Sequence, residues 1–282
     1  MIEVDGVELC TEPFGEPDDP PILLIMGMAT SMVGWEEGFG RLLAGGGRFV
    51  IRYDHRDTGR SVTYEPGRPG YSGPDLVADA TRVLDGYEIP AAHVVGTSMG
   101  GAIAQELALD YPDRVLTVVL MNTSPGGPGD GGLPPISEEY ARFLARAQPD
   151  PSDPEALIDY VVDDYRALNG PHRDFDDAHF RELVALEAER ARNPASAMNH
   201  ANAEGGEAWR HRLSSIDVPA LVIHGTADPM FAVEHGQALA SEIPGARLEV
   251  VEGAGHVLNP ADWETVSRAI IEHTEPVGDG GK

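Results

Sequence analysis

Short runs of apolar residues recur along the chain, each separated from the next by enough sequence to hold a helix. The runs are hydrophobic at successive positions, a pattern typical of parallel strands that are covered on both faces. They lie at residues 22–26, 49–51, 94–95, 115–121, 220–223 and 248–251. This alternation predicts an α/β fold with a doubly wound, mostly parallel sheet, in which ligands bind at the carboxyl ends of the strands.

The segments around these runs also carry recognisable patterns. At the start of the chain, Asp5-Gly6 separates apolar runs at 2–4 and 7–9, which predicts a hairpin, because this dipeptide suits the positive φ angles of a type I′ turn. Helices are predicted over 76–84 and 102–109, each followed by turn or breaker residues.

The alternation stops between residues 121 and 220. The Gly- and Pro-rich stretch 123–135 predicts a flexible exit from the sheet. Apolar residues then recur at spacings of three and four within 140–144, 157–165 and 180–186, which predicts helices. We therefore expect a core domain of residues 1–123 and 205–282 with a helical cap, residues 124–204, inserted into it. Only the exit and the tail 276–282 are low in complexity.

Composition limits the classes of partner. The chain has 282 residues, of which 20 are basic and 47 acidic, giving a net charge of −27. Because a nucleic-acid backbone and an anionic bilayer would both repel such a chain, neither is expected as a main partner. The acidity has two readings: solubility, or attraction of a neutral or cationic small molecule.

Cys10 is the only cysteine, so the chain can form no internal disulfide and no thiolate zinc cluster. No basic segment followed by an apolar stretch marks the N-terminus, and the longest apolar run, residues 22–29, is too short to span a bilayer. We expect a cytoplasmic protein that acts on a small molecule without a metal, as a monomer or a homodimer.

The segment Gly96-Thr97-Ser98-Met99-Gly100 matches the nucleophile elbow G-x-S-x-G. In that motif the serine stands on a strained turn, so the residues two places away on either side must lack side chains. The context fits, because an apolar run at 92–95 precedes the motif and a helical pattern at 101–108 follows it. The alternative is a glycine-rich turn that only packs or holds a phosphate.

A serine nucleophile needs a base, and the base needs an acid that orients it. Asp228 follows the run at 220–223, and His256 follows the run at 248–251, so both are expected at carboxyl ends of strands in the order Ser, Asp, His. Among ten histidines His256 is chosen by position, and His55 is its best rival. Asn122 has the right place for an alternative acid but cannot carry the charge. Asp228 could instead only form a turn.

The developing oxyanion needs two backbone N–H groups. One is expected from Met99, the residue after the nucleophile, and the other from Met28, where Gly27 gives the chain room to turn after the run at 22–26. With Gly27, Met32 is a candidate for the substrate pocket, and the alternative for these methionines is plain packing.

With these motifs in place, the chain resembles the α/β-hydrolase-fold serine hydrolases over nearly its whole length except the cap. The resemblance is carried by residues 22–35, 50–61, 83–101 and 218–256. Around 54–61 and 96–101 it is most similar to anthracycline methylesterases of the aclacinomycin type. The resemblance implies Ser98 as nucleophile, Asp228 as acid, His256 as base, and Met28 and Met99 as oxyanion amides.

One departure from the family pattern affects the acyl site. Many members have His-Gly where this chain has Met26-Gly27, and a glycine is common at the position of Met28. Backbone donation survives this change, whereas the shape of the acyl site is altered by the extra side chain.

The function expected is a cofactor-independent carboxylic ester hydrolase, with a methyl ester of a polyketide-like molecule as the specific version. A perhydrolase or a carbon–carbon bond hydrolase could use the same triad, and a ligand-binding or sensor member of the fold is the alternative from another class. Ser98 excludes an aspartate-nucleophile epoxide hydrolase or haloalkane dehalogenase.

Two further groups of residues have competing interpretations. The polar segment 54–61 is expected to be a loop beneath the nucleophile in which Asp54, Arg56 and Asp57 pair with one another and with the backbone, rather than a second catalytic site. The aromatic residues of the cap could cover a bulky planar substrate or form the cap's own small core, and the second role is favoured for most of them. They are Tyr140, Phe143, Tyr160, Tyr165, Phe175, Phe180 and Trp209.

Overall fold

A seven-stranded sheet forms the centre of the computed structural model, which describes residues 1–126, 132–150 and 153–275. The strand order is β3-β5-β4-β6-β7-β8-β9, and every neighbouring pair is parallel except β3 with β5. This confirms the predicted doubly wound, mostly parallel α/β fold. The strands are β3 (Thr11–Phe14), β4 (Pro21–Ile25), β5 (Phe49–Tyr53), β6 (Ala92–Thr97), β7 (Val115–Met121), β8 (Ala220–Gly225) and β9 (Arg247–Val251).

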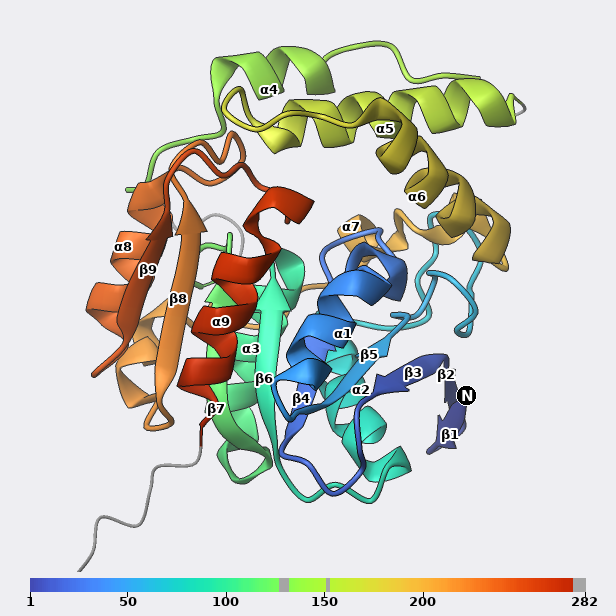
Figure 1. Ribbon diagram of the computed structural model, residues 1–282. Helices are drawn as coiled ribbons and strands as arrows, with labels where there is room; N and C mark the ends of the chain where they lie inside the picture. Colours follow the sequence, from blue (N-terminus) through green and yellow to red (C-terminus); the bar gives the residue numbers. More distant parts are fainter. Residues whose placement is uncertain (127–131, 151–152, 276–282) are drawn as a thin grey trace, which may run out of the picture.

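Helices cover both faces of the sheet (Figure 1). Successive residues of β4 point to opposite sides: Leu23 packs in a hydrophobic cluster with α2, α3 and α8, and Leu24 in one with α1 and α9. This two-sided burial is why the strands are apolar at successive positions. The helices are α1 (Glu37–Gly45), α2 (Gly73–Gly86), α3 (Met99–Asp110), α8 (Val233–Glu242) and α9 (Trp263–His273).

The N-terminal hairpin has the predicted form. β1 (Ile2–Val4) pairs antiparallel with β2 (Val7–Leu9), and the two turn residues have φ angles of 53° at Asp5 and 76° at Gly6. Strand β3 was not predicted, because Thr11-Glu-Pro-Phe14 has only one large apolar residue and contains a proline. An edge strand tolerates proline because one side of its backbone needs no partner.

Among the described residues, four α-helices lie between β7 and β8 in the sequence. In Figure 1, α4, α5 and α6 lie above the carboxyl ends of the strands. Residues 127–131 of the predicted flexible exit and the tail 276–282 are outside the described residues. The helices are α4 (Glu138–Leu144), α5 (Pro154–Asn169), α6 (Asp177–Arg190) and α7 (Asn199–Asn202). Short 3-10 helices occupy Met32–Gly34, Pro112–Arg114, Pro194–Ser196, Arg210–Ser215 and Pro260–Asp262.

Both connections of this helical segment are fastened to α3 by one buried side chain. The amide of Gln105 donates to Ser124 O (3.0 Å), and its carbonyl oxygen accepts from Gly126 N (3.1 Å) and from the indole of Trp209 (3.2 Å). Trp209 is therefore part of the core and not of a substrate cover. The exit and the return of the inserted helices are thus held beside the helix that follows the predicted nucleophile.

Candidate active site

Ser98 lies between β6 and α3 on a turn that only small neighbours allow. Its φ angle is 53° and its ψ angle −120°, and its N–H donates to Met121 O (3.0 Å). A Cβ atom on Gly96 would lie 2.1 Å from Gly100 O, and one on Gly100 would lie 2.1 Å from Ile25 O. The glycines of the motif are therefore required by backbone sterics, and the strain at Ser98 is the kind that marks functional sites.

Substituting Gly100 by alanine is expected to lower the free energy of unfolding by about 3 kcal/mol or more, because the new Cβ would overlap a backbone oxygen that cannot move cheaply. Gly45→Ala is the matched control: Gly45 is also helical, with nothing within 4 Å of an added Cβ, so its change should be neutral or stabilising. Urea unfolding of both variants measures the difference. Equal stabilities would contradict the steric argument.

Asp228 and His256 are brought together as the sequence predicts. His256 Nδ1 lies 2.8 Å from Asp228 Oδ2, and both residues are buried. The other carboxylate oxygen accepts from Met230 N (2.8 Å) and Phe231 N (2.9 Å), which fixes the orientation of the acid. Because an ionised carboxylate only accepts hydrogen bonds, His256 donates from Nδ1, and its Nε2 is left as the proton acceptor.

The loops of Ser98, Asp228 and His256 meet at the end of β7. Ser98 N donates to Met121 O, and Thr123 Oγ1 donates to Ser98 O (2.8 Å). Among the described residues, no hydrogen bond joins the Ser98 hydroxyl to His256. Such contacts are often long in uncomplexed enzymes and shorten when substrate binds.

Asn122 holds the other two loops in place. Its side-chain amide donates to His256 O (2.9 Å) and Gly255 O (3.3 Å), and its carbonyl oxygen accepts from Gly225 N (3.1 Å). Its φ angle of 42° is unusual for a residue other than glycine. Asn122, which the sequence placed where an alternative acid could stand, is therefore a neutral residue whose hydrogen bonds connect the loops of Asp228 and His256.

The loop after β4 runs beside the nucleophile. A Cβ atom on Gly27 would lie 3.4 Å from Ser98 Cβ and 3.9 Å from Ser98 Oγ, so the glycine lets this backbone approach the hydroxyl closely. Met28 follows directly and its side chain is 44% exposed, while Met99 begins α3. The two candidate oxyanion amides thus belong to segments that meet at Ser98, and their role as donors stays a prediction.

The Met32 side chain is 1% exposed and packs with Cys10 and Val33 in a small hydrophobic cluster. Its backbone N–H donates to Asp54 Oδ1 (2.9 Å). This burial favours the packing interpretation of Met32 over contact with substrate.

His55, the rival for the base, is fully buried with its Nε2 3.0 Å from Met26 O. Since a carbonyl oxygen only accepts, Nε2 carries the proton and donates. Burial, together with nearby His200, lowers the pKa of His55 to about 3. The His55 ring is therefore neutral near pH 7, and its Nε2–H already donates to a carbonyl oxygen. Both facts favour His256 over His55 as the base.

The segment 54–61 is indeed a network of polar contacts, but the expectation that its charged residues pair with one another was wrong. Asp54 accepts from Met32 N and from Arg190 of α6 (2.9 Å), and Arg56 pairs with Asp79 of α2 (2.6 Å). Asp57 accepts instead from Tyr64 N, the Tyr71 hydroxyl and the Asn199 amide. The side-chain partners Arg190, Asp79 and Asn199 come from other elements because the buried loop lies between the core and the inserted helices.

Helix α5 contributes to the site in a way that sequence patterns did not reveal. Leu168 O accepts from the backbone N–H of His256 (2.7 Å), and a Cβ on Gly255 would lie 2.3 Å from Asn169 O. The base loop is therefore tied directly to the inserted helices, at a glycine that admits their backbone. A carbonyl at the end of an amphipathic helix leaves no signal in the sequence.

A carboxylate of the same helix lies within electrostatic reach of His256. The Tyr140 hydroxyl donates to Asp164 Oδ1 (3.0 Å), and burial raises the pKa of Asp164, an effect that the hydrogen bond and His256 oppose. Sequence reasoning missed Asp164, because a single acidic residue on a helix with several others carries no motif.

Most aromatic residues of the inserted helices pack against one another. Phe175 stacks on Phe180 with 4.4 Å between ring centroids, and Tyr165 lies 5.3 Å from Phe180. Tyr140 and Phe143 form a cluster with Leu168 that also contacts Met230 and Val257, which flank the acid and base. These contacts support the predicted role as a small core. Through Met230 and Val257, this core also packs the inserted helices against the loops of Asp228 and His256.

Glu187 of α6 also connects the inserted helices to the core, because its carboxylate accepts from Ser31 N in the loop after β4. Burial raises its pKa to about 7. A carboxyl group whose pKa is raised on folding contributes stability at low pH that is lost as the pH rises through 7. Glu187→Gln, which keeps the acceptor oxygen, should therefore raise the melting temperature relative to the wild type by about 2 °C more at pH 8.5 than at pH 5.5.

Thermal scans at the two pH values test this expectation, with Glu189→Gln as the control because Glu189 is an exposed residue of the same helix. An equal response of both variants at both pH values would contradict it. Glu106, whose pKa burial also raises to about 7, keeps part of the wild-type pH dependence in either variant.

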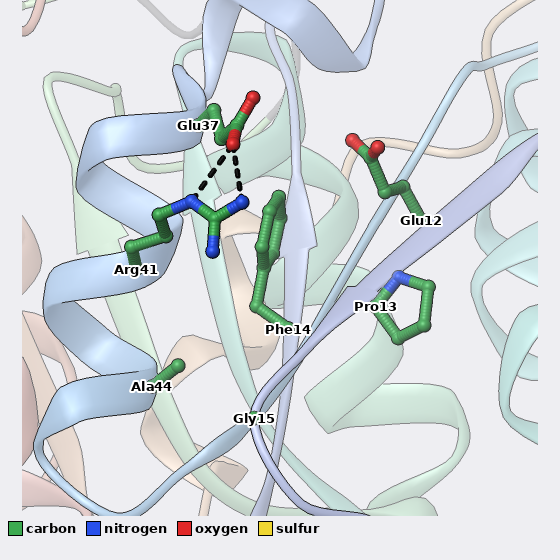
Figure 2. A pocket seen from close by; sticks show the side chains of 7 residues that line it. All are labelled: Glu12, Pro13, Phe14, Gly15, Glu37, Arg41 and Ala44. Atoms are coloured by element: carbon green, nitrogen blue, oxygen red, sulfur yellow. Dashed lines mark hydrogen bonds and ion pairs between the residues drawn. The ribbon is translucent and has the colours of Figure 1, made fainter.

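A hollow elsewhere in the described structure lacks the features of an active site. Figure 2 shows a hollow at the antiparallel edge of the sheet, where Arg41 pairs with Glu37 (Nε–Oε1 2.7 Å) and lies over Phe14. Its charged groups already have partners, and none of the candidate residues Ser98, Asp228 and His256 lines it. Within residues 1–126, 132–150 and 153–275, no group of three or more His, Cys, Asp or Glu could hold a metal ion, and no helix is long and apolar enough to cross a membrane.

Comparisons with known proteins agree with the fold. The profile of the alpha/beta hydrolase fold family matches residues 20–260. The chain is 37% identical to the rhodomycin D methylesterases of Streptomyces sp. (strain C5) and Streptomyces peucetius, over 97% of each chain. A solved N-acyl homoserine lactone degrading enzyme is 29% identical over 95% of this chain and 98% of its own, with a TM-score of 0.72. An esterase from Rhodococcus sp. ECU1013, 24% identical with a TM-score of 0.78 over 97% and 98%, shares the fold.

Proposed function

Because the chain belongs to the α/β-hydrolase fold family, we propose that it is a carboxylic ester hydrolase that uses Ser98, His256 and Asp228 as a catalytic triad. The observation that carries the proposal is the 2.8 Å contact between His256 Nδ1 and a carboxylate whose second oxygen is held by two backbone N–H groups. An imidazole oriented in this way, at an edge shared with a strained serine, is the arrangement that nucleophilic acyl transfer needs.

The reaction follows from these positions. Ser98 Oγ attacks the ester carbonyl carbon while its proton passes to His256 Nε2, and the carbonyl oxygen becomes an oxyanion. When the oxyanion collapses, the bond to the alcohol oxygen breaks, and His256 returns the proton to the leaving alcohol. Water then attacks the acyl-enzyme with His256 again accepting and returning a proton, which releases the acid and restores Ser98. Asp228 stabilises the imidazolium throughout.

The oxyanion is stabilised by backbone N–H groups of Met28 and Met99. Met99 lies at the first turn of α3, where the N–H groups have no partner within the helix and the helix dipole favours negative charge. Gly27 brings the second segment beside Ser98. These two amides, with the triad, supply the nucleophile, the proton transfer and the charge stabilisation, so the reaction needs no cofactor.

A methyl ester of a polyketide-like small molecule is the proposed substrate. Two methylesterases named for rhodomycin D align over 97% of this chain, a match that includes residues 124–204 as well as the core. We assign this segment the role of a cap that sets specificity, and we expect the enzyme to act in the cytoplasm as a monomer or a homodimer. The net charge of −27 suits a neutral or cationic substrate.

The test is methanol release from methyl esters of anthracycline-type polyketides, compared with hydrolysis of simple aryl acetates. We expect the polyketide esters to have kcat/KM values at least about tenfold higher, because remote binding energy raises the rate of the chemical step. If the polyketide esters are turned over no faster than aryl acetates, the proposed substrate class is wrong, but the proposal of an ester hydrolase still stands.

Fluorophosphonate labelling tests the nucleophile separately. Mass spectrometry should find one adduct, on the peptide that contains Ser98. A folded protein that forms no adduct and hydrolyses no ester would indicate a ligand-binding member of the fold instead.

A further inference from the structure

Two buried histidines hold the loop that follows β4 from opposite sides of the proposed oxyanion hole. His55, in the loop after β5, donates from Nε2 to Met26 O (3.0 Å). His200, on α7 of the cap, accepts the N–H of Ala29 at Nδ1 (2.9 Å). The two rings meet edge to face with 5.5 Å between their centroids. One histidine belongs to the core and the other to the inserted segment.

These contacts flank one peptide unit. The proposed donor is the N–H of Met28, which belongs to the peptide between Gly27 and Met28. His55 holds the oxygen of the preceding peptide and His200 holds the nitrogen of the following one. Thr30 Oγ1 donates to the oxygen of that following peptide, Met28 O (3.2 Å). Because planar peptide units rotate only about the bonds between them, fixing both neighbours fixes the direction of the Met28 N–H.

Ala29 shows that this loop needs support. Its φ angle is 58°, in the left-handed region that costs a residue with a side chain of order 1 kcal/mol or more. Such a conformation persists only when surrounding contacts hold it. The hydrogen bond from Ala29 N to His200 acts directly on the strained residue.

The protonation of His200 follows from its contacts. Its Nε2 lies 2.8 Å from Arg56 O, which can only accept, so Nε2 carries the proton and Nδ1 presents a lone pair to Ala29 N. The side chain is buried, and the edge of Tyr71 lies 6.4 Å away between ring centroids. The ring is thus clamped between the segment 54–61 and the loop after β4, and its orientation is determined by hydrogen bonds at both nitrogens.

We infer that His200 is a positioning residue for the oxyanion hole, through which the cap completes the catalytic site. The inference rests on the proposed function, because it takes the Met28 N–H as an oxyanion donor. His200 does not touch the reacting atoms. It aligns the donor by accepting the neighbouring N–H, so its loss should weaken interactions made in the transition state more than substrate binding.

Two substitutions separate the acceptor from the rest of the side chain. In His200→Asn the amide oxygen can take the place of Nδ1 and keep the bond to Ala29 N. In His200→Gln the amide nitrogen can take the place of Nε2 and keep the bond to Arg56 O, while Ala29 N loses its acceptor. Both variants lose the ring and one hydrogen bond, so their melting temperatures should fall by similar amounts.

We expect His200→Gln to lower kcat by about 10- to 100-fold with KM within about threefold of wild type, because a misplaced oxyanion donor costs catalysis and not ground-state binding. His200→Asn should restore kcat to within about threefold of wild type. The affinity for an aryl boronic acid, which forms a tetrahedral adduct with the serine, should fall in His200→Gln by the same factor as kcat.

The controls distinguish the possible failures. His211→Gln, at an exposed position, should leave kcat unchanged. Equal losses of kcat in His200→Asn and His200→Gln, in proportion to their losses of stability, would overturn the inference and leave His200 as a packing residue. If Ser98→Ala in the same assay is as active as wild type, the proposed function itself fails, whatever the His200 variants do.

Discussion

Ser98→Ala is expected to lower kcat/KM for ester hydrolysis by about 10⁴-fold or more, the largest effect of any substitution in the chain. Without Oγ no acyl-enzyme can form, and the residual rate comes from the oxyanion amides and from substrate positioning alone. Substrate affinity should change little, because the substitution removes only Oγ. The remaining Cβ leaves the backbone conformation of the elbow unchanged. Burst-phase kinetics with a chromogenic ester, alongside binding of the acid product, measure the two effects separately.

Ser214→Ala is the matched control, since Ser214 is exposed and lies outside the proposed site. Equal melting temperatures of the two variants would exclude unfolding as the cause of the loss. A Ser98→Ala enzyme with more than a tenth of wild-type activity would show that another group is the nucleophile.

Asp228→Asn should lower kcat at pH 7 by about 10³- to 10⁴-fold, close to the loss seen for the corresponding change in serine proteases. The asparagine oxygen can keep accepting from Met230 N and Phe231 N, so its NH₂ group faces His256 Nδ1. That contact favours the tautomer in which Nδ1 accepts and Nε2 carries the proton. The imidazole then cannot take the proton from Ser98, although every heavy atom stays near its place.

Single-turnover kinetics with an activated ester measure this loss at the acylation step. The control is Asp217→Asn, an exposed position that should leave the rate unchanged. Loss of less than tenfold in Asp228→Asn would mean that the Asp228 carboxylate is not the orienting acid. His224 lies 3.7 Å from the same carboxylate oxygen and donates to Phe231 O (2.8 Å), so its own hydrogen bond does not depend on the substituted atom.

The parallel strands were predictable because each is buried on both faces, which forces a continuous apolar run. Each of the six predicted runs begins and ends within two residues of the observed strand, the run at 94–95 marking the centre of β6. β3 could not be predicted in the same way. It is an edge strand that has no fully buried residue and contains a proline, so its stability comes from pairing with β5 and not from its own composition.

In the candidate site, too, some features follow from local sequence and others depend on contacts between distant segments. The elbow was predictable because its geometry depends on atoms of a few consecutive residues. The placement of Asp228 and His256 was predictable because the carboxyl ends of parallel strands meet at one edge. The contacts of Asn122, Leu168 and His200 were not predictable. Asn122 was considered only as an alternative acid, for which it lacks the charge, and its hydrogen bonds to two other loops were not foreseen; the other two residues carry no motif.

The sequence by itself thus determined the sheet, the strained serine and the order of the three triad candidates, because burial on two faces and local backbone sterics are written in short stretches of chain. Only the tertiary structure decided what supports them. The bond from Ala29 N to His200 joins residues 171 positions apart, and that from Asn122 to His256 joins residues 134 apart. Such pairs form only when separately folded elements pack, and a polar residue that will meet a distant backbone group looks like any other along the chain.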